Sequence, residues 1–420
     1  MATINVPADF TTISAAIAAA SPGDTIIVAA GLYNEHVDIN VASLTLLGAQ
    51  SGVDARTRPF IAINESIITL AAPAFGTGIV NLSAPNIIFD GFTVQGTGPI
   101  VNATGGIFAG DPGNFLPNTT TIDVTGMQII NNIIQNNASG ILIASIEGPP
   151  KAPNYLVQFN FFQNNSGNPG SGNGQGVFFN NSAGTAMTNV IVTENLFNGL
   201  ETSSAVNLSN ITTGIISANV MNQDNSISIF GTTDVSITGN VTTGATGITP
   251  DFPANTASGI FVGFGNTNTI ISSNLIFNAT NNGISIFNGN SNITITDNCI
   301  VGNTASGITL NNGGGPANSN IIINNNNIRL NTIGLNLNLA SYTIPPILDA
   351  TLNYWNSSLG PNYNGTNPGG GDTITDNNIL AIQSVQYEPF LISAITCPSP
   401  IELTKIIYEY KCYTWCSNIL

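Results

Sequence analysis

The sequence predicts an all-β fold, a single right-handed parallel β-helix (a solenoid) with a short N-terminal capping helix and a C-terminal cap or tail. The first observation is a repeat in which the pattern apolar, any, apolar, any, any, Asn, any, apolar recurs along the chain. The second is a set of short alternating strands between the repeats, such as "SGILIA" from Ser139 and "SGITLN" from Ser306. The third is composition, because 42% of residues are apolar and only 7% are charged, so solubility depends on Asn, Thr, Ser and Gly.

Each copy of the repeat contains one asparagine at the same place. The gaps between copies run from 21 residues (Asn219 to Asn240) to 35 residues (Asn160 to Asn195), which is typical of one coil with loops inserted at its corners. Units this short cannot bury an apolar face alone, so stacked coils are needed to close a continuous core. The eight repeat asparagines are Asn132, Asn160, Asn195, Asn219, Asn240, Asn274, Asn298 and Asn326.

These asparagines have a physical reason to recur. We expect them at sharp corners between strands, because Asn tolerates the left-handed backbone conformation. Coils stacked at roughly 4.8 Å would also let their amides bond to one another. The sequence therefore predicts an asparagine ladder along the molecule.

Residues 1–48 are expected to form an N-terminal cap and the first coil. The segment "DFTTISAAIAAA" from Asp9 predicts a short helix, with Ile13 and Ile17 one turn apart. A helix there can cover the raw strand edges at the end of a β-helix. Residues 22–33, "PGDTIIVAAGLY", then read as the first coil.

Residues 49–393 are expected to form the remaining coils, with inserts at 96–121, 144–153, 164–176, 242–258 and 341–372. Binding surfaces of solenoids usually lie on such loops. The aromatic residues Tyr342, Tyr354, Trp355 and Tyr363 are expected to close the last coil, with part of the patch exposed. The spacing of the phenylalanines favours core packing over a sugar-stacking platform; these are Phe159, Phe161, Phe178, Phe197, Phe230, Phe261, Phe277 and Phe287.

Two segments carry a resemblance to a known superfamily. Residues 3–39, "TINVPADFTTISAAIAAASPGDTIIVAAGLYNEHVDI", resemble the N-terminal cap and first coil of pectin-lyase-like right-handed parallel β-helix proteins. Residues 349–361, "DATLNYWNSSLGP", resemble the tryptophan-bearing closing motif of its β-helix-repeat members. With the repeats, the resemblance covers about residues 3–393. It implies the fold and leaves the function open, because members include lyases, esterases, hydrolases, tailspikes and adhesins.

The catalytic motifs of the enzymatic branches are absent from the sequence. The chain lacks the "DFIFG" and "LGRPW" motifs of pectin methylesterases and the "NTD", "GHG" and "RIK" motifs of polygalacturonases. Pectate lyases need Arg or Lys beside calcium-binding aspartates, whereas Lys151 and Arg329 stand in no acidic cluster in sequence. The one histidine, His36, is expected at the surface or in packing. We predict no catalytic residue, no cofactor and no metal site.

One weak acidic cluster deserves testing against the structure. Asp224 and Asp234 could face each other around one coil, and Asp251 lies in a nearby insert. Carboxylates could serve a glycosidase or hold calcium. Scattered surface acids are the more ordinary interpretation of such a group.

Residues 394–420 are expected to form a separate tail rich in cysteine and aromatic residues. Cys299 is expected to be a small buried hydrophobe in a strand. The three tail cysteines favour either an inert cap or a cross-link to a neighbouring subunit; they are Cys397, Cys412 and Cys416.

Charge and hydropathy exclude several partners. The chain carries 6 basic and 22 acidic residues, a formal net charge of −16, so it lacks the clustered cations that nucleic acid or polyanions require. No stretch reaches the roughly 18 apolar residues of a membrane span. No signal peptide is visible. The low charge nonetheless favours an extracellular or surface location.

These observations lean away from an enzyme. The leading hypothesis is a non-enzymatic extracellular or surface β-helix with a structural or adhesive role, which self-associates through its tail or binds another surface protein. One alternative is a polysaccharide lyase or glycoside hydrolase of the same fold. Another is a module that binds neutral glycan.

Overall fold

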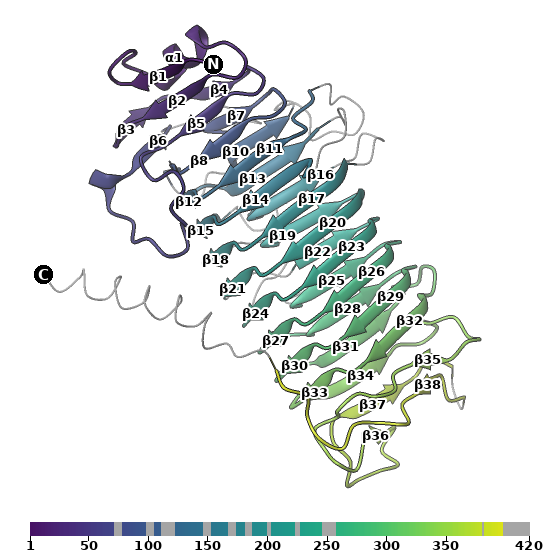
Figure 1. The fold of residues 1–420 in the computed structure, drawn as a ribbon. Helices are drawn as coiled ribbons and strands as arrows, with labels where there is room; N and C mark the ends of the chain where they lie inside the picture. The colour runs from purple at the N-terminus through teal and green to yellow at the C-terminus, as the bar shows by residue number, and fades with distance from the viewer. Residues whose placement is uncertain are drawn as a thin grey trace, which may run out of the picture. The chain divides into compact units, whose positions relative to one another are not determined.

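A computed structural model describes residues 1–70, 78–97, 105–110, 122–145, 153–166, 174–180, 187–199, 203–222, 227–245, 258–379 and 382–397. The chain divides into two compact units, Met1–Glu201 and Thr202–Pro398. Between β2 (Thr25–Val28) and β35 (Leu348–Asp349) every third strand returns to the same sheet, so each of these coils gives one strand to each of three parallel sheets, A, B and C (Figure 1).

The first unit contains the earlier strands of each sheet. Sheet A orders β1 (Thr3–Val6), β2 (Thr25–Val28), β5 (Thr45–Leu47), β8 (Ile88–Asp90), β11 (Met127–Ile130), β14 (Tyr155–Gln158) and β17 (Met187–Thr193). Sheet B orders β3 (Gly31–Asn34), β6 (Ser66–Thr69), β9 (Thr93–Gln95), β12 (Ile133–Gln135), β15 (Phe161–Gln163) and β18 (Leu196–Asn198). Sheet C orders β4 (Val37–Ile39), β7 (Val80–Leu82), β10 (Gly105–Gly110), β13 (Ser139–Ala144) and β16 (Val177–Asn180).

The second unit repeats the arrangement with later strands. Its sheet A orders β20 (Ile211–Ser217), β23 (Thr233–Thr238), β26 (Thr267–Ser272), β29 (Ser291–Thr296), β32 (Ser319–Asn324), β35 (Leu348–Asp349) and β38 (Val385–Gln386). Its sheet B orders β21 (Val220–Asn222), β24 (Val241–Thr243), β27 (Leu275–Phe277), β30 (Cys299–Val301) and β33 (Asn327–Arg329). Its sheet C orders β19 (Val206–Ser209), β22 (Ile227–Phe230), β25 (Ile260–Gly263), β28 (Ile284–Phe287), β31 (Ser306–Asn311), β34 (Ile333–Leu337), β37 (Thr373–Asp376) and β36 (Asn362–Tyr363).

This topology confirms the predicted fold class. Parallel pairing of β23 with β26 and of β26 with β29 shows the pattern, and crossovers between parallel strands of one sheet are right-handed. The chain is a right-handed parallel β-helix with the three-sheet coil of pectin-lyase-like proteins, as the resemblance implied. Apolar side chains point inward from all three sheets and form the core.

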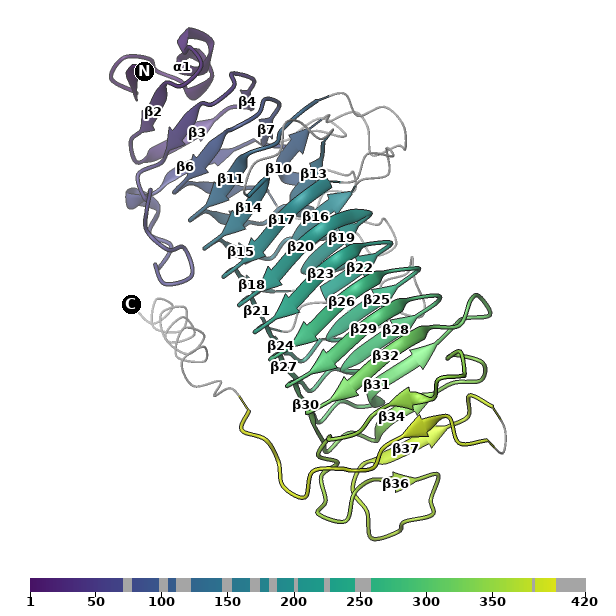
Figure 2. The same ribbon diagram turned by 45° about the vertical axis from the view of Figure 1, so that its right-hand side comes forward.

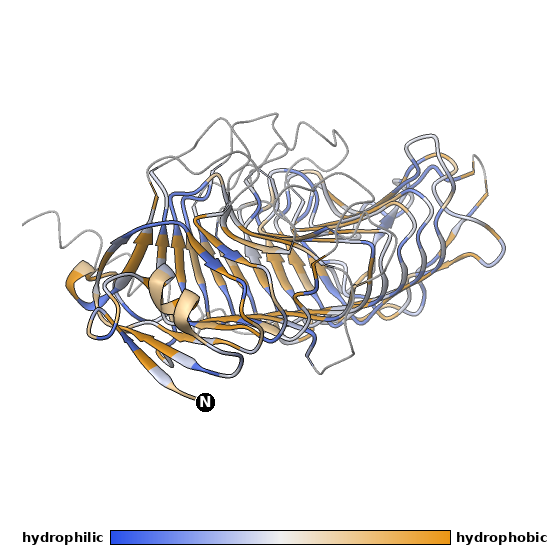
Figure 3. Cartoon of the chain, turned by 90° about the horizontal axis from the view of Figure 1, so that it is seen from above, coloured by the Kyte–Doolittle hydropathy of each residue, from blue (hydrophilic) through white to orange (hydrophobic). Residues whose placement is uncertain are grey.

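The predicted N-terminal helix is present as α1 (Ile13–Ala19), and it lies over the end of the first coils (Figure 3). Its Ile13 and Ile17 are buried. The Thr12 hydroxyl accepts from the backbone N of Ala15 at 3.1 Å, and the Glu35 carboxylate accepts from the backbone N of Ile13 at 2.9 Å, so the first turn is capped. One element was missed, because β1 precedes the helix and pairs with β2.

The predicted asparagine ladder is confirmed within each unit. All eight repeat asparagines are fully buried. Side-chain amides connect Asn132 to Asn160 to Asn195 in the first unit, at 3.2 and 3.0 Å. In the second unit the connections between consecutive members measure 2.9 to 3.0 Å, and the ladder continues beyond the predicted residues to Asn353.

The predicted reason for the asparagines was wrong in one respect. The left-handed conformation belongs to the residue before each ladder asparagine, for example Glu194 (φ 53), Ala218 (φ 51) and Asp297 (φ 57). The ladder asparagine itself turns its amide into the core, where the neighbouring coil supplies its partners. The repeat therefore selects Asn for stacked hydrogen bonds and not for corner geometry.

Two further ladders stand at fixed offsets from the first. Five residues after the ladder position, Asn303 bonds Asn331 at 2.9 Å, and the row ends on Asp372. Eight residues before the ladder position, Asn266 bonds Asn290 and Asn290 bonds Asn318, at 2.9 and 3.0 Å. The constant offsets are visible in the sequence and could have revealed both rows.

Candidate functional site

The predicted acidic cluster is not assembled by the described residues. Asp234 lies exposed on β23, where its Oδ1 accepts from the Asn268 Nδ2 at 3.0 Å. Asp224 and Asp251 lie outside the described residues. Asp234 thus serves a polar row on the sheet surface.

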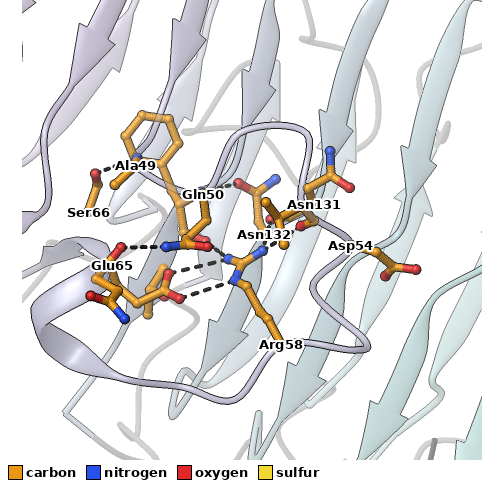
Figure 4. Close-up of polar contacts among 12 residues, drawn as sticks. Ala49, Gln50, Asp54, Arg58, Glu65, Ser66, Asn131 and Asn132 are labelled. Atoms are coloured by element: carbon orange, nitrogen blue, oxygen red, sulfur yellow. Dashed lines mark hydrogen bonds and ion pairs between the residues drawn. The ribbon is translucent and has the colours of Figure 1, made fainter.

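The most elaborate charged network lies in the first unit, under the loop between β5 and β6 (Figure 4). Arg58 and Glu65 are both buried and form an ion pair, with the Arg58 Nε 3.1 Å from Glu65 Oε1. The Arg58 Nη1 donates to the backbone oxygens of Val53 and Asn131, both at 2.8 Å. The Nη2 reaches the Glu65 Oε2 at 3.3 Å and the Phe92 oxygen at 3.5 Å.

This network is structural. A guanidinium has five N–H donors, and all five of Arg58 are used by protein acceptors. Glu65 is likewise occupied, since its Oε2 also accepts from the Thr93 hydroxyl at 2.9 Å. Arg56 pairs with Asp54 at 2.8 Å and stacks over the Phe159 ring. These groups fasten the loop to three coils, and Arg58 has no donor left for a substrate.

Two buried acids occupy the last coils of the second unit. Burial raises the pKa of the Asp372 carboxyl, and hydrogen bonds from the backbone and side chain of Asn331 and the backbone of Leu330 work in the opposite direction. Asp376 accepts from the Tyr363 hydroxyl at 2.7 Å. Burial first, and then this hydrogen bond, raises the pKa of Tyr363 above its ordinary value. Both acids are committed to protein donors.

The expectation that the aromatic residues near these acids close the last coil, with part of the patch exposed, is confirmed in part. Trp355 and Tyr342 are buried and close the coil, while Tyr354 and Tyr363 are half-buried. His36 is exposed, as expected, with its Nε2 3.3 Å from the Asn81 Nδ2.

The cysteine predictions are corrected by a disulfide. Cys299 and Cys397 are bonded to each other across 98 residues of sequence. Cys299 is buried as expected, but it is no inert thiol, and Cys397 cannot cross-link a neighbour while this bond is intact. Cys412 and Cys416 lie outside the described residues. The bond fastens the start of the tail to sheet B, close to Asn327.

Metal ligands do not gather in the part of the chain that the structure describes, where no three His, Cys, Asp or Glu side chains converge. Neither of the two described helices has the length and apolarity that a membrane span requires.

The prediction that the phenylalanines are buried is confirmed for Phe261 (0% exposed) and Phe287 (9% exposed), but these two rings lie on the outer side of sheet C and not inside the coils. On β25 the core residues Ile260 and Val262 point inward, so the alternation of the strand turns Phe261 outward. Phe230 and Phe287 occupy outward positions on β22 and β28 by the same rule. The prediction is wrong for the half-buried rings, whereas Phe161 and Phe197 are buried as predicted; the half-buried rings are Phe159, Phe178, Phe230 and Phe277. A strand with apolar residues on both faces gives no sequence signal for which face is inside.

The outward rings form an aromatic cluster on sheet C of the second unit, made of Phe230, Phe261, Phe264 and Phe287. The ring centroids of Phe230 and Phe264 are 6.2 Å apart and their planes are 25° from parallel. The Phe264 ring meets the Phe287 ring edge-on, with 5.3 Å between the centroids. Phe261 lies 5.6 Å from Phe230 and 6.1 Å from Phe287. Gly263 makes room for the cluster, because a Cβ there would lie 2.4 Å from the Phe261 ring.

Phe264 is the unusual member of the cluster. It lies at a left-handed corner (φ 62), where the neighbouring coils carry Gly231 (φ 57) and Asn288 (φ 66). Gly and Asn tolerate this conformation, whereas a bulky residue costs roughly 1–2 kcal/mol there. Phe264 is 39% exposed, so part of its ring remains open to solvent while the rest packs against Phe230 and Phe287. Strain of this kind is characteristic of functional positions.

The surroundings of the aromatic cluster are polar and uncharged. The outward row in register with it runs Ser209, Phe230, Gly263, Phe287, Asn311. The next row runs Asn207, Ser228, Phe261, Ser285, Thr309. Half-buried Asn288 and Asn312 occupy the corner positions that correspond to Phe264 in the next two coils. Rings beside amides and hydroxyls suit a ligand that has both apolar faces and hydroxyl groups.

Comparison with known proteins finds likeness at the level of the fold. No family model matches the chain, and no curated protein matches it. A mannuronic-acid-specific polysaccharide family 6 lyase from human gut microbiota is 11% identical, over 96% of this chain and 93% of that one, with a TM-score of 0.49.

Two other solved structures show the same degree of likeness. The A-module of the Azotobacter vinelandii mannuronan C-5 epimerase AlgE6 is 15% identical, over 92% of this chain and 94% of that one, with a TM-score of 0.42. The enzymatically active domain of bacteriophage CBA120 tailspike protein 2 is 13% identical, over 85% of this chain and 48% of that one, also with a TM-score of 0.42. At such identities the likeness concerns the coil architecture alone.

Proposed function

We propose that this chain is an extracellular or surface-exposed β-helix protein that binds neutral polysaccharide without cleaving it. The observation that carries the proposal is the strained, exposed Phe264 ring within the aromatic cluster on sheet C. A pyranose ring presents an apolar face to such rings, and its hydroxyl groups find amide and hydroxyl partners beside them.

The charge distribution supports a neutral ligand. The two outward rows around the aromatic cluster carry no ionised side chain, and the chain has a net charge of −16. A polyanion such as an acidic glycan would be repelled and would meet no cation on this surface. Of the described arginines, Arg56 and Arg58 are held in ion pairs in the first unit, and Arg329 lies on strand β33 of sheet B, away from these rows.

The partners of the described acids and bases support binding without turnover. Arg58, Glu65, Asp372 and Asp376 are buried and bonded to protein partners. A glycosidase needs two carboxyl groups about 5–9.5 Å apart beside its substrate, and no carboxylate lines the described rows of the aromatic cluster. An extracellular location agrees with the Cys299–Cys397 disulfide, because such bonds persist in oxidising compartments.

The test is a binding and turnover panel with the full chain. Neutral polysaccharides (cellulose, chitin, xylan, galactomannan) and acidic ones (alginate, polygalacturonate) are compared by pull-down and by calorimetry. Phe264→Asn removes the ring and leaves a residue suited to the corner, as at Asn288. It is expected to weaken binding of the neutral ligand at least about tenfold, or roughly 1.4 kcal/mol.

Leu330→Asn is the matched control. Leu330 is also exposed (63%) and left-handed (φ 60), but it lies outside the aromatic cluster, so binding should not change. Failure to bind any neutral polysaccharide, or equal binding by both variants, contradicts the proposal. New reducing ends or unsaturated products would instead establish the alternative of a lyase or hydrolase.

A further inference from the structure

A second surface of the same unit has a regularity that glycan binding at the aromatic cluster does not use. This surface is the outer face of sheet A on β20, β23, β26, β29 and β32, which lie side by side in Figure 2. Its outward residues stand in straight rows, because neighbouring strands pair in exact register over β23, β26 and β29. Successive members of a row are roughly 4.8 Å apart.

The middle row of this face alternates large and small residues. It runs Ile215, Ser236, Ile270, Thr294, Ile322. The three isoleucines are 39%, 48% and 39% exposed. Apolar side chains so exposed at every second coil form knobs about 9.6 Å apart, with a hydroxyl-bearing gap between each pair.

Hydroxyl rows flank the middle row on both sides. One runs Thr212, Thr233, Thr267, Ser291, Ser319, and the other runs Ser217, Thr238, Ser272, Thr296, Asn324. Neighbours within the rows are already bonded, as Thr233 to Thr267 at 3.1 Å and Ser272 to Thr238 at 3.2 Å. Side chains held in this way lose little freedom on docking.

The face is also nearly free of charge. On these five strands Asp234 is the one ionised side chain, and it stands beside the first hydroxyl row in a line of exposed amides with Asn268 and Asn292. Two carboxylates lie at the borders of the face: Asp297 accepts from the Thr296 hydroxyl, and Asp349 continues the middle row on β35. Two copies of a chain with net charge −16 repel each other over most of their surface. The uncharged face is where they can approach.

We infer that this face of sheet A docks against the same face of a second copy of the chain. A two-fold axis along the strands reverses the coil order and leaves each hydroxyl row over its own counterpart. With the axis between β26 and β29, Ile270 of one copy faces the partner's Thr294, and Ile322 faces the partner's Ser236. Both isoleucines among these four residues then meet a gap, and the third, Ile215, faces the partner's Asp349 at the edge of the face. The strand directions of the two sheets agree as in aligned sheet packing.

The test is the mass in solution, by sedimentation velocity over a concentration series. It uses full chains with Cys412→Ser and Cys416→Ser, so that tail disulfides cannot link copies. A dimer is expected, and the triple variant Ile215→Thr, Ile270→Thr, Ile322→Thr should raise its dissociation constant at least about tenfold. Threonine keeps the β-branched shape that suits a strand, and circular dichroism confirms folding. Ile382→Thr is the control, since Ile382 is 54% exposed and lies outside these rows.

A second variant acts on the gap and not on the knob. Thr294→Trp fills the position opposite Ile270 and should dissociate the dimer without removing any isoleucine. A monomer at all concentrations, or a dimer that persists in both variants, would overturn the inference. So would a monomer that loses polysaccharide binding in the triple variant, because the face would then belong to a glycan. Phe264→Asn should leave the mass unchanged, so this test and the test of glycan binding fail independently.

Discussion

Replacing Asn298 by alanine tests whether the inner ladder holds the coils of the second unit together. The Asn298 Oδ1 accepts from the backbone N and the Nδ2 of Asn274, at 3.0 and 2.9 Å. Its Nδ2 donates to the Ile271 oxygen at 2.8 Å and to the Thr296 oxygen at 2.9 Å. The same Nδ2 reaches the Asn326 Oδ1 at 3.0 Å. The residue is fully buried, so solvent water does not replace these partners.

The cost follows from counting the groups that lose a partner. Alanine leaves the buried N–H of Asn274 without an acceptor, which costs about 1–3 kcal/mol. It also removes the two N–H donors of the Asn298 amide, at a net cost of about 1 kcal/mol each. We expect the free energy of unfolding to fall by about 3–5 kcal/mol. Urea unfolding followed by circular dichroism measures it, with an unchanged slope against denaturant.

Asn292→Gly is the control in the same coil, on strand β29 just before Asn298. Asn292 belongs to an exposed amide row, where it bonds Asn268 at 3.0 Å, and its φ of 56 is one that glycine adopts freely. The expected change is within about 0.5 kcal/mol. A loss below about 1 kcal/mol for Asn298→Ala, or equal losses for the two variants, would refute the reasoning that buried amides stabilise the stack and exposed ones do not.

Three further outcomes are expected. Replacing both Cys299 and Cys397 by alanine opens a closed loop of 98 residues, and the chain-entropy relation predicts that the free energy of unfolding falls by about 4.7 kcal/mol. Urea unfolding measures this loss. An unchanged free energy of unfolding would mean that the disulfide does not constrain the unfolded chain. Arg58→Met leaves Glu65 charged and buried, so stability should drop by about 3–5 kcal/mol and the 48–65 loop should become protease-sensitive, while adding Glu65→Met should restore most of both. Because the pKa of Tyr363 is raised in the folded state, its contribution to the free energy of unfolding is fully present below the ordinary tyrosine pKa of 10.0 and is lost as the pH rises through the pKa of the folded state. The loss of stability at alkaline pH, followed by circular dichroism, should therefore be shallower in Tyr363→Phe. An identical curve for the two proteins would contradict this.

The repeat positions could be read from the sequence because every coil needs apolar residues and a buried asparagine at the same places. Asn274, Asn298 and Asn326 each follow two inward apolar residues and precede another at a fixed offset. The helix over Ile13 and Ile17 was equally readable, since its apolar spacing and Thr12 cap are local features. Where the information is local and repeated, the prediction held.

The errors arose where both faces of a strand carry apolar residues. In "SGIFVG" the residues Ile260, Phe261 and Val262 are all apolar, so alternation cannot tell which of them faces the core. The pairing of Cys299 with Cys397 escaped for a different reason, because 98 residues of coil separate them and only the fold brings them together.

The sequence by itself determined that coils stack and which amides line up inside them, because apolar and Asn positions recur with each turn of the chain. The tertiary structure decided which rings face solvent, which cysteines meet, and which outward residues share a row. Those properties depend on the register between coils separated by inserts of unequal length, and register is set only when the sheets pair.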